Sequence, residues 1–231
     1  MNETIIAEMT KIIERNATDA DAFYNRALAH RQAGNLSQAL VDISSSISLD
    51  REDMVSTYIG YAETNYNAGN FYKAINEYDM AISLKSCLTS AYVGRAMVYL
   101  KMRDYIPALL DFGMAIKLDP GNAVAYYNRA VTFDDMSVKY HEIQNKRAIA
   151  SDKKHYLFKA IIDYSKAIEL DTGYAEAYYK RGIDYYETGN AFAAIDDFLK
   201  VIELDSKHIE VKENIQKCFC KKIKINKYTN H

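Results

Sequence analysis

Apolar residues recur along the chain at a short spacing that is typical of a helix. Tyr92, Ala96 and Tyr99 lie three or four residues apart, and Ala108 and Phe112 begin a second run with the same spacing. This spacing places the apolar side chains on one face, because an α-helix turns once in about 3.6 residues. The pattern therefore predicts pairs of amphipathic helices joined by short segments.

A longer period of about 34 residues is superimposed on the helical one. An Ile-x-Leu motif recurs at intervals of 35, 34, 52 and 34 residues, and a series of alanines keeps the same intervals. The single long interval exceeds its neighbours by 18 residues, which indicates one insertion in an otherwise regular array. The motif begins at Ile47, Ile82, Ile116, Ile168 and Ile202, and the alanines are Ala39, Ala74, Ala108, Ala160 and Ala194.

Turn residues separate the two helices of each predicted pair. Gly34, Gly69 and Gly189 are each followed by Asn. Glycine lets a helix end in the left-handed conformation, and Asn is a good cap for the next helix. In the third unit Arg103 stands where the glycine is expected, and Pro120 lies between units, where it removes no needed hydrogen bond. Each unit is therefore predicted to be a helix–turn–helix hairpin.

The period and its small and aromatic positions resemble the tetratricopeptide repeat, with Phe or Tyr in place of the family's first Trp. The resemblance implies an all-α fold, namely a right-handed superhelical α-solenoid of hairpins, and a single domain over residues 1–231. Terminal helices would cover the ends of such an array. We expect an N-terminal helix in 1–19, repeats at 20–53, 55–88, 89–122, 123–174 and 175–208, and a capping helix with a basic tail in 209–231.

A recurring pair of opposite charges offers an independent test of this register. Four units carry Arg in the first helix and Asp at the equivalent place in the second helix. We predict a partly buried, bidentate ion pair between the two helices of each such unit. The alternative is a set of unrelated surface charges, which contribute little to stability. The predicted pairs are Arg26 with Asp42, Arg95 with Asp111, Arg129 with Asp163, and Arg181 with Asp197.

The composition agrees with a helical protein and limits the classes of function. There are 9 Gly and 2 Pro in 231 residues, which is few for a sheet protein with many turns. The net charge of −2 gives no case for binding nucleic acid or an anionic membrane through the whole protein. Three Cys do not make a disulfide framework, and no apolar run resembles an export signal or a membrane span. We expect a soluble, cytoplasmic protein.

The sequence contains no recognisable catalytic or metal-binding motif. It has no phosphate-binding glycine motif, no H-E-x-x-H and no nucleophile elbow. His30 occupies a core-facing repeat position, where packing is expected. Cys218 and Cys220 are two residues apart, so on a helix they face different directions and chelate poorly. We therefore expect no enzymatic activity, no cofactor, no metal and no small-molecule substrate.

The family resemblance assigns the functional surface to the concave face, which the first helix of each hairpin lines. The lining is apolar and rich in Tyr, which suits a bound peptide, although each residue could instead pack against the neighbouring repeat. The carboxylate clamp of chaperone adaptors is not reproduced, because Val93 and Met97 replace its polar residues and Glu176 would repel a carboxylate. The expected groove residues are Tyr24, Leu28, Arg31, Ile59, Glu63, Tyr66, Val93, Met97, Leu100, Tyr127, Asn128, Val131, Tyr179, Lys180, Ile183 and Tyr186.

The sequence thus predicts a non-enzymatic adaptor that binds a peptide or helical segment of a partner protein in a concave groove. The alternative is a scaffold or self-associating subunit that uses the convex face, the insertion at 134–159 or the C-terminal tail. The insertion and the tail are rich in Lys, and each is either a docking surface or a tolerated extension. Binding of nucleic acid through them is not favoured at this net charge.

Overall fold

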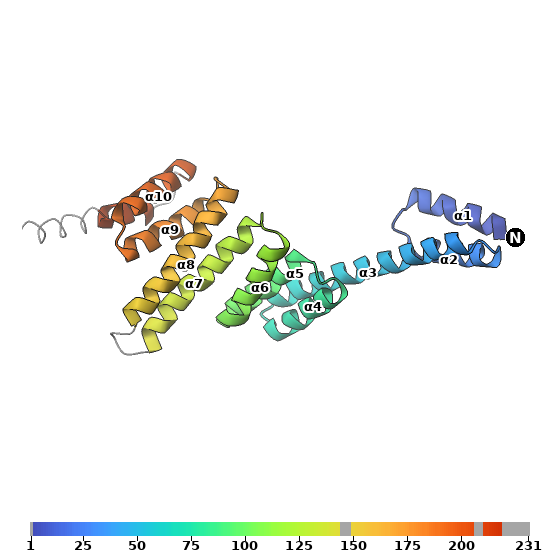
Figure 1. Cartoon of the computed structure of the whole chain (residues 1–231), viewed down its shortest axis with the longest axis horizontal. Coiled ribbons are helices and arrows are strands. Elements are labelled where there is room, and N and C mark those ends of the chain that lie inside the picture. The colour runs from blue at the N-terminus through green and yellow to red at the C-terminus, as the bar shows by residue number, and fades with distance from the viewer. Residues whose placement is uncertain (1, 144–148, 206–209, 219–231) are drawn as a thin grey trace, which may run out of the picture. The chain divides into compact units, whose positions relative to one another are not determined.

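The computed structural model describes residues 2–143, 149–205 and 210–218, and these residues form helices joined by short turns (Figure 1). This confirms the all-α prediction. Two compact units, Met1–Cys87 and Leu88–His231, make up the chain. The labelled helices are α1 (Asn2–Arg15), α2 (Ala20–Gln32), α3 (Leu36–Asn67) and α4 (Phe71–Leu84) in the first unit, and α5 (Thr89–Lys101), α6 (Tyr105–Leu118), α7 (Ala123–Ile143), α8 (Ile149–Leu170), α9 (Ala175–Thr188) and α10 (Ala191–Leu204) in the second.

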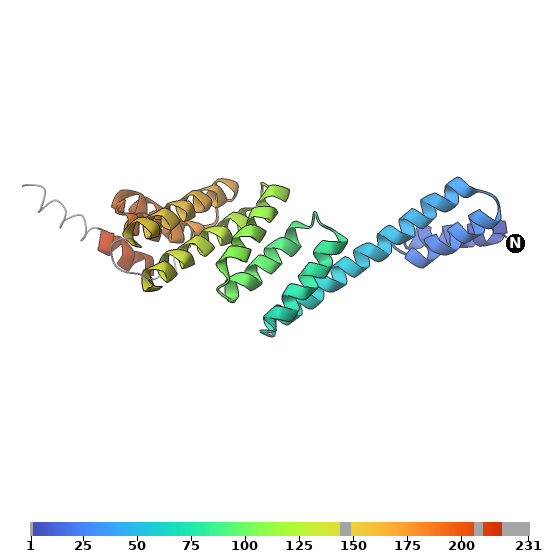
Figure 2. The ribbon, with the colours of Figure 1, turned by 60° about the horizontal axis from the view of Figure 1, so that its bottom comes forward.

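The first unit is organised around α3, a single helix of 32 residues. The helices α1 and α2 lie beside its N-terminal half, and α4 packs against its C-terminal half (Figure 2). The boundary expected between the first two repeats, at residues 53–55, therefore lies inside a continuous helix instead of at a turn.

The absence of turn residues explains why α3 continues through this boundary. Residues 50–53 read Asp-Arg-Glu-Asp, whereas the equivalent residues 119–122 read Asp-Pro-Gly-Asn. At the second site Asp119 ends α6 in an extended conformation, and its Oδ1 accepts a hydrogen bond of 3.0 Å from the Gly121 N–H. Proline and glycine stop a helix, whereas Arg and Glu are good helix formers.

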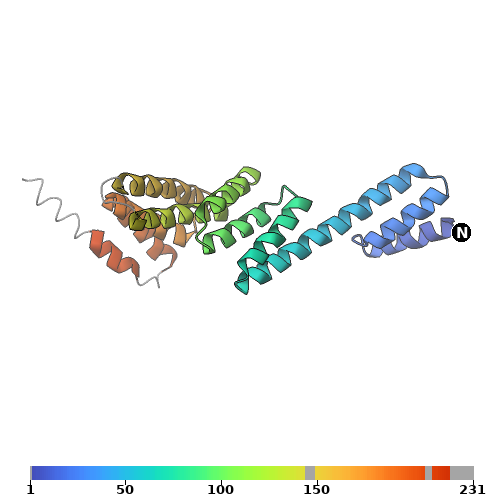
Figure 3. The same cartoon turned by 90° about the horizontal axis from the view of Figure 1, so that it is seen from below.

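The second unit contains three helical hairpins, α5 with α6, α7 with α8, and α9 with α10 (Figure 3). In each hairpin a small residue of the first helix faces a large aromatic residue of the second. The closest approach is at Gly182, where an added Cβ would lie 2.8 Å from Cε1 of the buried Phe198. A larger side chain at this position would overpack the core.

The insertion lies where α7 meets α8. These helices are 21 and 22 residues long, compared with 13 and 14 residues for α5 and α6. The basic residues predicted for the tip of the insertion, among them Lys139, Lys146 and Arg147, lie outside the residues whose side chains the structure describes. The predicted basic tail at 219–231 is also outside the described part of the chain.

All four predicted Arg–Asp ion pairs are present and bidentate. In each, the Arg Nε and Nη2 groups donate to the two carboxylate oxygens at 2.6–2.8 Å. The Arg guanidinium also lies over the ring of the aromatic residue three positions earlier, at 5.4–5.7 Å from its centre. The repeated aromatic position thus packs and also supports the charged pair.

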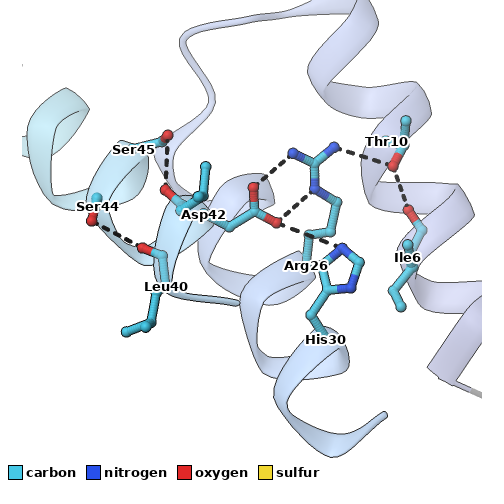
Figure 4. A network of polar contacts seen from close by, with 9 residues as sticks. Ile6, Thr10, Arg26, His30, Leu40, Asp42, Ser44 and Ser45 are labelled. Carbon is cyan, nitrogen blue, oxygen red and sulfur yellow. Dashed lines mark hydrogen bonds and ion pairs between the residues drawn. The ribbon is translucent and has the colours of Figure 1, made fainter. Parts of the chain in front are cut away.

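The first of these pairs extends into a larger polar network (Figure 4). Arg26 Nη1 donates to the Thr10 hydroxyl of α1 at 3.2 Å, which ties the N-terminal helix to the hairpin. His30 Nε2 lies 4.0 Å from Asp42 Oδ2, and His30 Nδ1 is buried with no hydrogen-bond partner. His30 is therefore placed inside the hairpin, as its repeat position predicts.

Candidate functional site

A cavity of about 540 Å³ opens between α5, α7 and α9 in the second unit. Three successive first helices of the hairpins contribute to it, so the equivalent helix faces come together as the repeat period predicts. Six of the predicted groove residues line this cavity, namely Met97, Leu100, Tyr127, Asn128, Val131 and Lys180. Four further lining residues were not predicted, namely Lys101, Arg103, Asp135 and Glu176.

The floor of this cavity is apolar and partly structural. Met97 and Leu100 pack against the core around the buried Phe112. The Tyr127 ring stacks on Tyr174 with 4.8 Å between ring centres and contacts Tyr164 at 5.7 Å. Burial raises the pKa of the Tyr127 hydroxyl, so the side chain stays neutral. The alternative of packing against a neighbouring repeat therefore applies to Tyr127 in addition to any contact with a ligand.

Charges of both signs surround the floor. Lys101, Arg103 and Lys180 supply positive charge, and Asp135 and Glu176 supply negative charge. Partial burial raises the pKa of Asp135, and the positive charges of Lys180 and Arg103 oppose that rise. An apolar floor with an ionic rim can bury one or two apolar side chains of a ligand and orient its polar groups.

Arg103 is a strained residue at the edge of this cavity. Its φ is 59°, in the left-handed region that Gly34, Gly69 and Gly189 occupy at the equivalent turns. A side chain in this conformation costs about 1 kcal/mol relative to glycine. The signal was visible in the sequence as an Arg in place of the expected Gly, but only the fold places that Arg at the cavity.

We expect Arg103→Gly to raise the free energy of unfolding by about 1 kcal/mol, because it relieves backbone strain. Urea denaturation of the full chain followed by circular dichroism measures the change. Gly69→Ala is the mirror control: Gly69 has φ 76° and open space around its missing Cβ, so the variant should lose a similar amount. A less stable Arg103→Gly variant would contradict this account of the turn.

Three other predicted groove residues, Tyr179, Ile183 and Tyr186, line a separate cavity of about 250 Å³. The chain's own helical segment 210–218 forms the other side of that cavity. The Tyr179 hydroxyl donates to Glu210 Oε2 at 2.8 Å and accepts from Asn214 Nδ2 at 3.3 Å. These residues thus bind the C-terminal segment of their own chain.

The remaining predicted residues are not gathered in one place. Val93 packs against the core beside Phe112. The others lie in the first unit and in two groups, because the continuous α3 separates the α2 hairpin from the C-terminal half of α3. One group, on α2, is Tyr24, Leu28 and Arg31, and the other, on α3, is Ile59, Glu63 and Tyr66.

Two acidic side chains lie in the core of the second unit, behind the large cavity. The Tyr164 hydroxyl donates to Asp134 Oδ2 at 2.8 Å, and Asp184 is buried beside them. Burial, followed by the charge of Asp134 and the hydrogen bond to it, raises the pKa of Asp184 to about 10, and burial raises the pKa of Asp134 to about 6. Asp184 therefore keeps a proton and donates it to Asp134. The sequence alone did not indicate this pair.

Lys180 connects this buried pair with the cavity. Its positive charge lowers the pKa of both Asp134 and Asp184, against the effect of burial. No three His, Cys, Asp or Glu side chains among the described residues are placed to hold a metal ion. In the same part of the chain, each helix is too short or too polar to span a bilayer.

Comparisons with known proteins identify the fold. A family model of the tetratricopeptide repeat matches residues 175–208. No curated protein matches the chain. The fold is similar to that of YrrB, described as "a TPR protein with an unusual peptide-binding site", with a TM-score of 0.54, 20% identity, and coverage of 89% of this chain and 96% of that chain.

Two further solved structures share the fold. The MamA structure has a TM-score of 0.56 and 22% identity, and the match covers 80% of this chain and 96% of that chain. For TTC0263, a thermophilic TPR protein of Thermus thermophilus, the TM-score is 0.55 and the identity 17%, with coverage of 72% of this chain and 81% of that chain. The chain is therefore a tetratricopeptide repeat protein.

Proposed function

We propose that the protein is a cytoplasmic, non-enzymatic adaptor that binds a peptide or helical segment of a partner protein in the cavity between α5, α7 and α9. The observation that carries this proposal is the apolar floor of Met97, Leu100 and Val131, bordered by charges of both signs. Tetratricopeptide repeats are in general protein-interaction modules. A peptide-binding site described for YrrB, which has a similar fold, supports the same class of ligand.

The size and chemistry of the cavity favour a short peptide segment. A volume of about 540 Å³ accommodates a few side chains of a ligand. Burial of apolar side chains on the floor supplies affinity, and the rim charges select and orient the segment. Lys101 is exposed and Lys180 half-buried at this rim, so their substitution changes the ligand environment with little effect on the core.

A peptide array provides the test, since the partner is to be found. Peptides selected on the purified full chain should bind the Lys101→Glu/Lys180→Glu variant at least about tenfold more weakly, because two rim charges are reversed. Isothermal titration with the selected peptides measures the change.

The matched control is Lys73→Glu/Lys117→Glu, which makes the same change in charge at exposed positions outside the cavity. It should bind the selected peptides as the wild type does. Equal binding by the cavity variant and the wild type would show that the peptides bind elsewhere.

A second candidate function is a scaffold that uses the outer surface of the second unit. Exposed apolar side chains recur every four residues on α6, at Ile106, Leu110 and Met114, and again on α8, at Phe158 and Ile162. A contiguous apolar surface of this kind favours contact with another protein.

A further inference from the structure

One face of α3 carries large apolar residues at intervals of seven. Leu40, Ile47, Met54 and Tyr61 have exposed fractions of 66, 60, 47 and 58%. Seven residues are close to two helical turns, so the four side chains form one stripe along the helix. A seven-residue apolar period sustained over several turns is typical of a helix that pairs with another helix. We name these four residues the α3 stripe.

The α3 stripe is separate from the faces that α2 and α4 cover. The α3 residues buried toward α2 include Ala39, Asp42 and Ser46, and Asp42 forms the ion pair with Arg26 of α2. In the C-terminal half, Val55 and Ala62 are buried. The stripe therefore remains open although both halves of α3 have packed neighbours.

The repeat itself indicates what the α3 stripe is built to contact. Ile47 is equivalent in the repeat to Ile168, which is only 7% exposed because it shares a core cluster with Ala177. Ala177 is in turn equivalent to Thr57, which is exposed. The chain turns between α8 and α9, so Ile168 and Ala177 meet. In the continuous α3 the equivalent residues are about 15 Å apart along the axis and cannot meet.

A second pair of equivalent positions leads to the same conclusion. Arg181 Nη1 of α9 donates to the Ser165 hydroxyl of α8 at 2.9 Å. The equivalent residues of α3 are Tyr61 and Ser44, and both are exposed. Two contacts that join neighbouring repeats in the second unit are thus left open in α3, and both halves of each contact lie on the same helix.

Both open pairs, Ile47 with Thr57 and Ser44 with Tyr61, are centred on Glu52 or beside it. An antiparallel partner helix of identical sequence, related by a two-fold axis near Glu52, would complete both pairs twice. We propose that the protein forms a symmetric dimer in which the α3 stripe of one copy packs antiparallel against the α3 stripe of a second copy. An interface of this kind is self-complementary, which is the requirement for a closed two-fold dimer.

The sequence at the centre of α3 favours a second copy over closure within one chain. Closure would require a turn at residues 50–53, which contain neither Gly nor Pro. The helix there also carries an ion pair between Glu52 and Lys85, which follows α4. Pairing of two intact α3 helices covers the stripe without breaking either helix.

Sedimentation velocity of the full chain tests the dimer. We expect twice the chain mass of 26.4 kDa for the wild type. Ile47→Glu/Met54→Glu should weaken dimerisation at least about 100-fold, because it places charges in the middle of the stripe on both copies. The control Val41→Glu/Tyr72→Glu changes two equally exposed apolar residues outside the stripe and should leave the dimer intact.

Cysteine trapping tests the orientation in a Cys87→Ser/Cys220→Ser background that retains the buried Cys218. Antiparallel pairing predicts a disulfide between chains when the Ile47→Cys and Thr57→Cys variants are mixed, and none when either variant is oxidised alone. A parallel dimer would instead cross-link each variant by itself.

Three results would overturn the proposal. The first is a wild-type chain that stays monomeric at every concentration that sedimentation velocity can measure. The second is equal weakening by the stripe variant and by the control. The third is a disulfide within one chain in the Ile47→Cys/Thr57→Cys double variant, which would mean that α3 breaks and closes on itself.

Discussion

Replacing Asp111 with Leu should lower the free energy of unfolding by about 3 kcal/mol, because it leaves the guanidinium of Arg95 without its carboxylate in a largely buried site. The Asp111 side chain is 8% exposed and accepts two hydrogen bonds of 2.7 Å from Arg95. Removing one member of such a pair forfeits both bonds and leaves an uncompensated charge. Urea denaturation of the full chain followed by circular dichroism measures the loss.

A double-mutant cycle separates the ion pair from simple loss of packing. Arg95→Leu should also destabilise the protein, whereas Arg95→Leu/Asp111→Leu should cost clearly less than the sum of the two single changes. Asp196→Leu, at a position of α10 outside the buried core, is the control and should change stability by less than about 0.5 kcal/mol. An Arg95→Leu variant as stable as the wild type would contradict a stabilising role for the pair.

Asp184→Asn should stabilise the protein at pH 8, and the gain should disappear near pH 4. Asp184 has a pKa of about 10 in the folded protein, chiefly because of burial, against an ordinary value of 3.8. The folded state therefore holds a proton that the unfolded state releases above pH 4, so wild-type stability falls as the pH rises from about 4 toward 10. Asn is neutral at every pH, occupies the same volume and can still donate to Asp134.

Thermal unfolding of the wild type and Asp184→Asn between pH 4 and pH 9 measures this effect. We expect the melting temperature of the wild type to fall across this range relative to that of the variant, by several degrees at pH 8. Asp196→Asn removes a carboxylate outside the buried core and should follow the wild-type curve. A constant difference between Asp184→Asn and the wild type at all pH values would show that Asp184 does not carry the buried proton.

The sequence determined the features that depend on local pattern and period. Spacings of three and four residues predicted amphipathic helices, because burial of one helix face needs no information from distant segments. The period placed Gly182 beside an aromatic residue and paired Arg95 with Asp111 across a hairpin, because each hairpin repeats the same short-range geometry. Six of the groove residues were found for the same reason: the period places equivalent faces of α5, α7 and α9 side by side.

Only the tertiary structure decided the features that depend on segments meeting. The ten-residue separation of Ile47 and Thr57 resembles that of Ile168 and Ala177, so the period suggested a contact, but helix continuity through residues 50–53 prevents it. The Asp134–Asp184 pair likewise arises from two helices, and its pKa values follow from burial that composition does not reveal. Tyr179 had the pattern of a groove residue, yet it bonds to Glu210 of its own chain. In each case the deciding quantity is which surface loses its water, and that depends on how the helices pack.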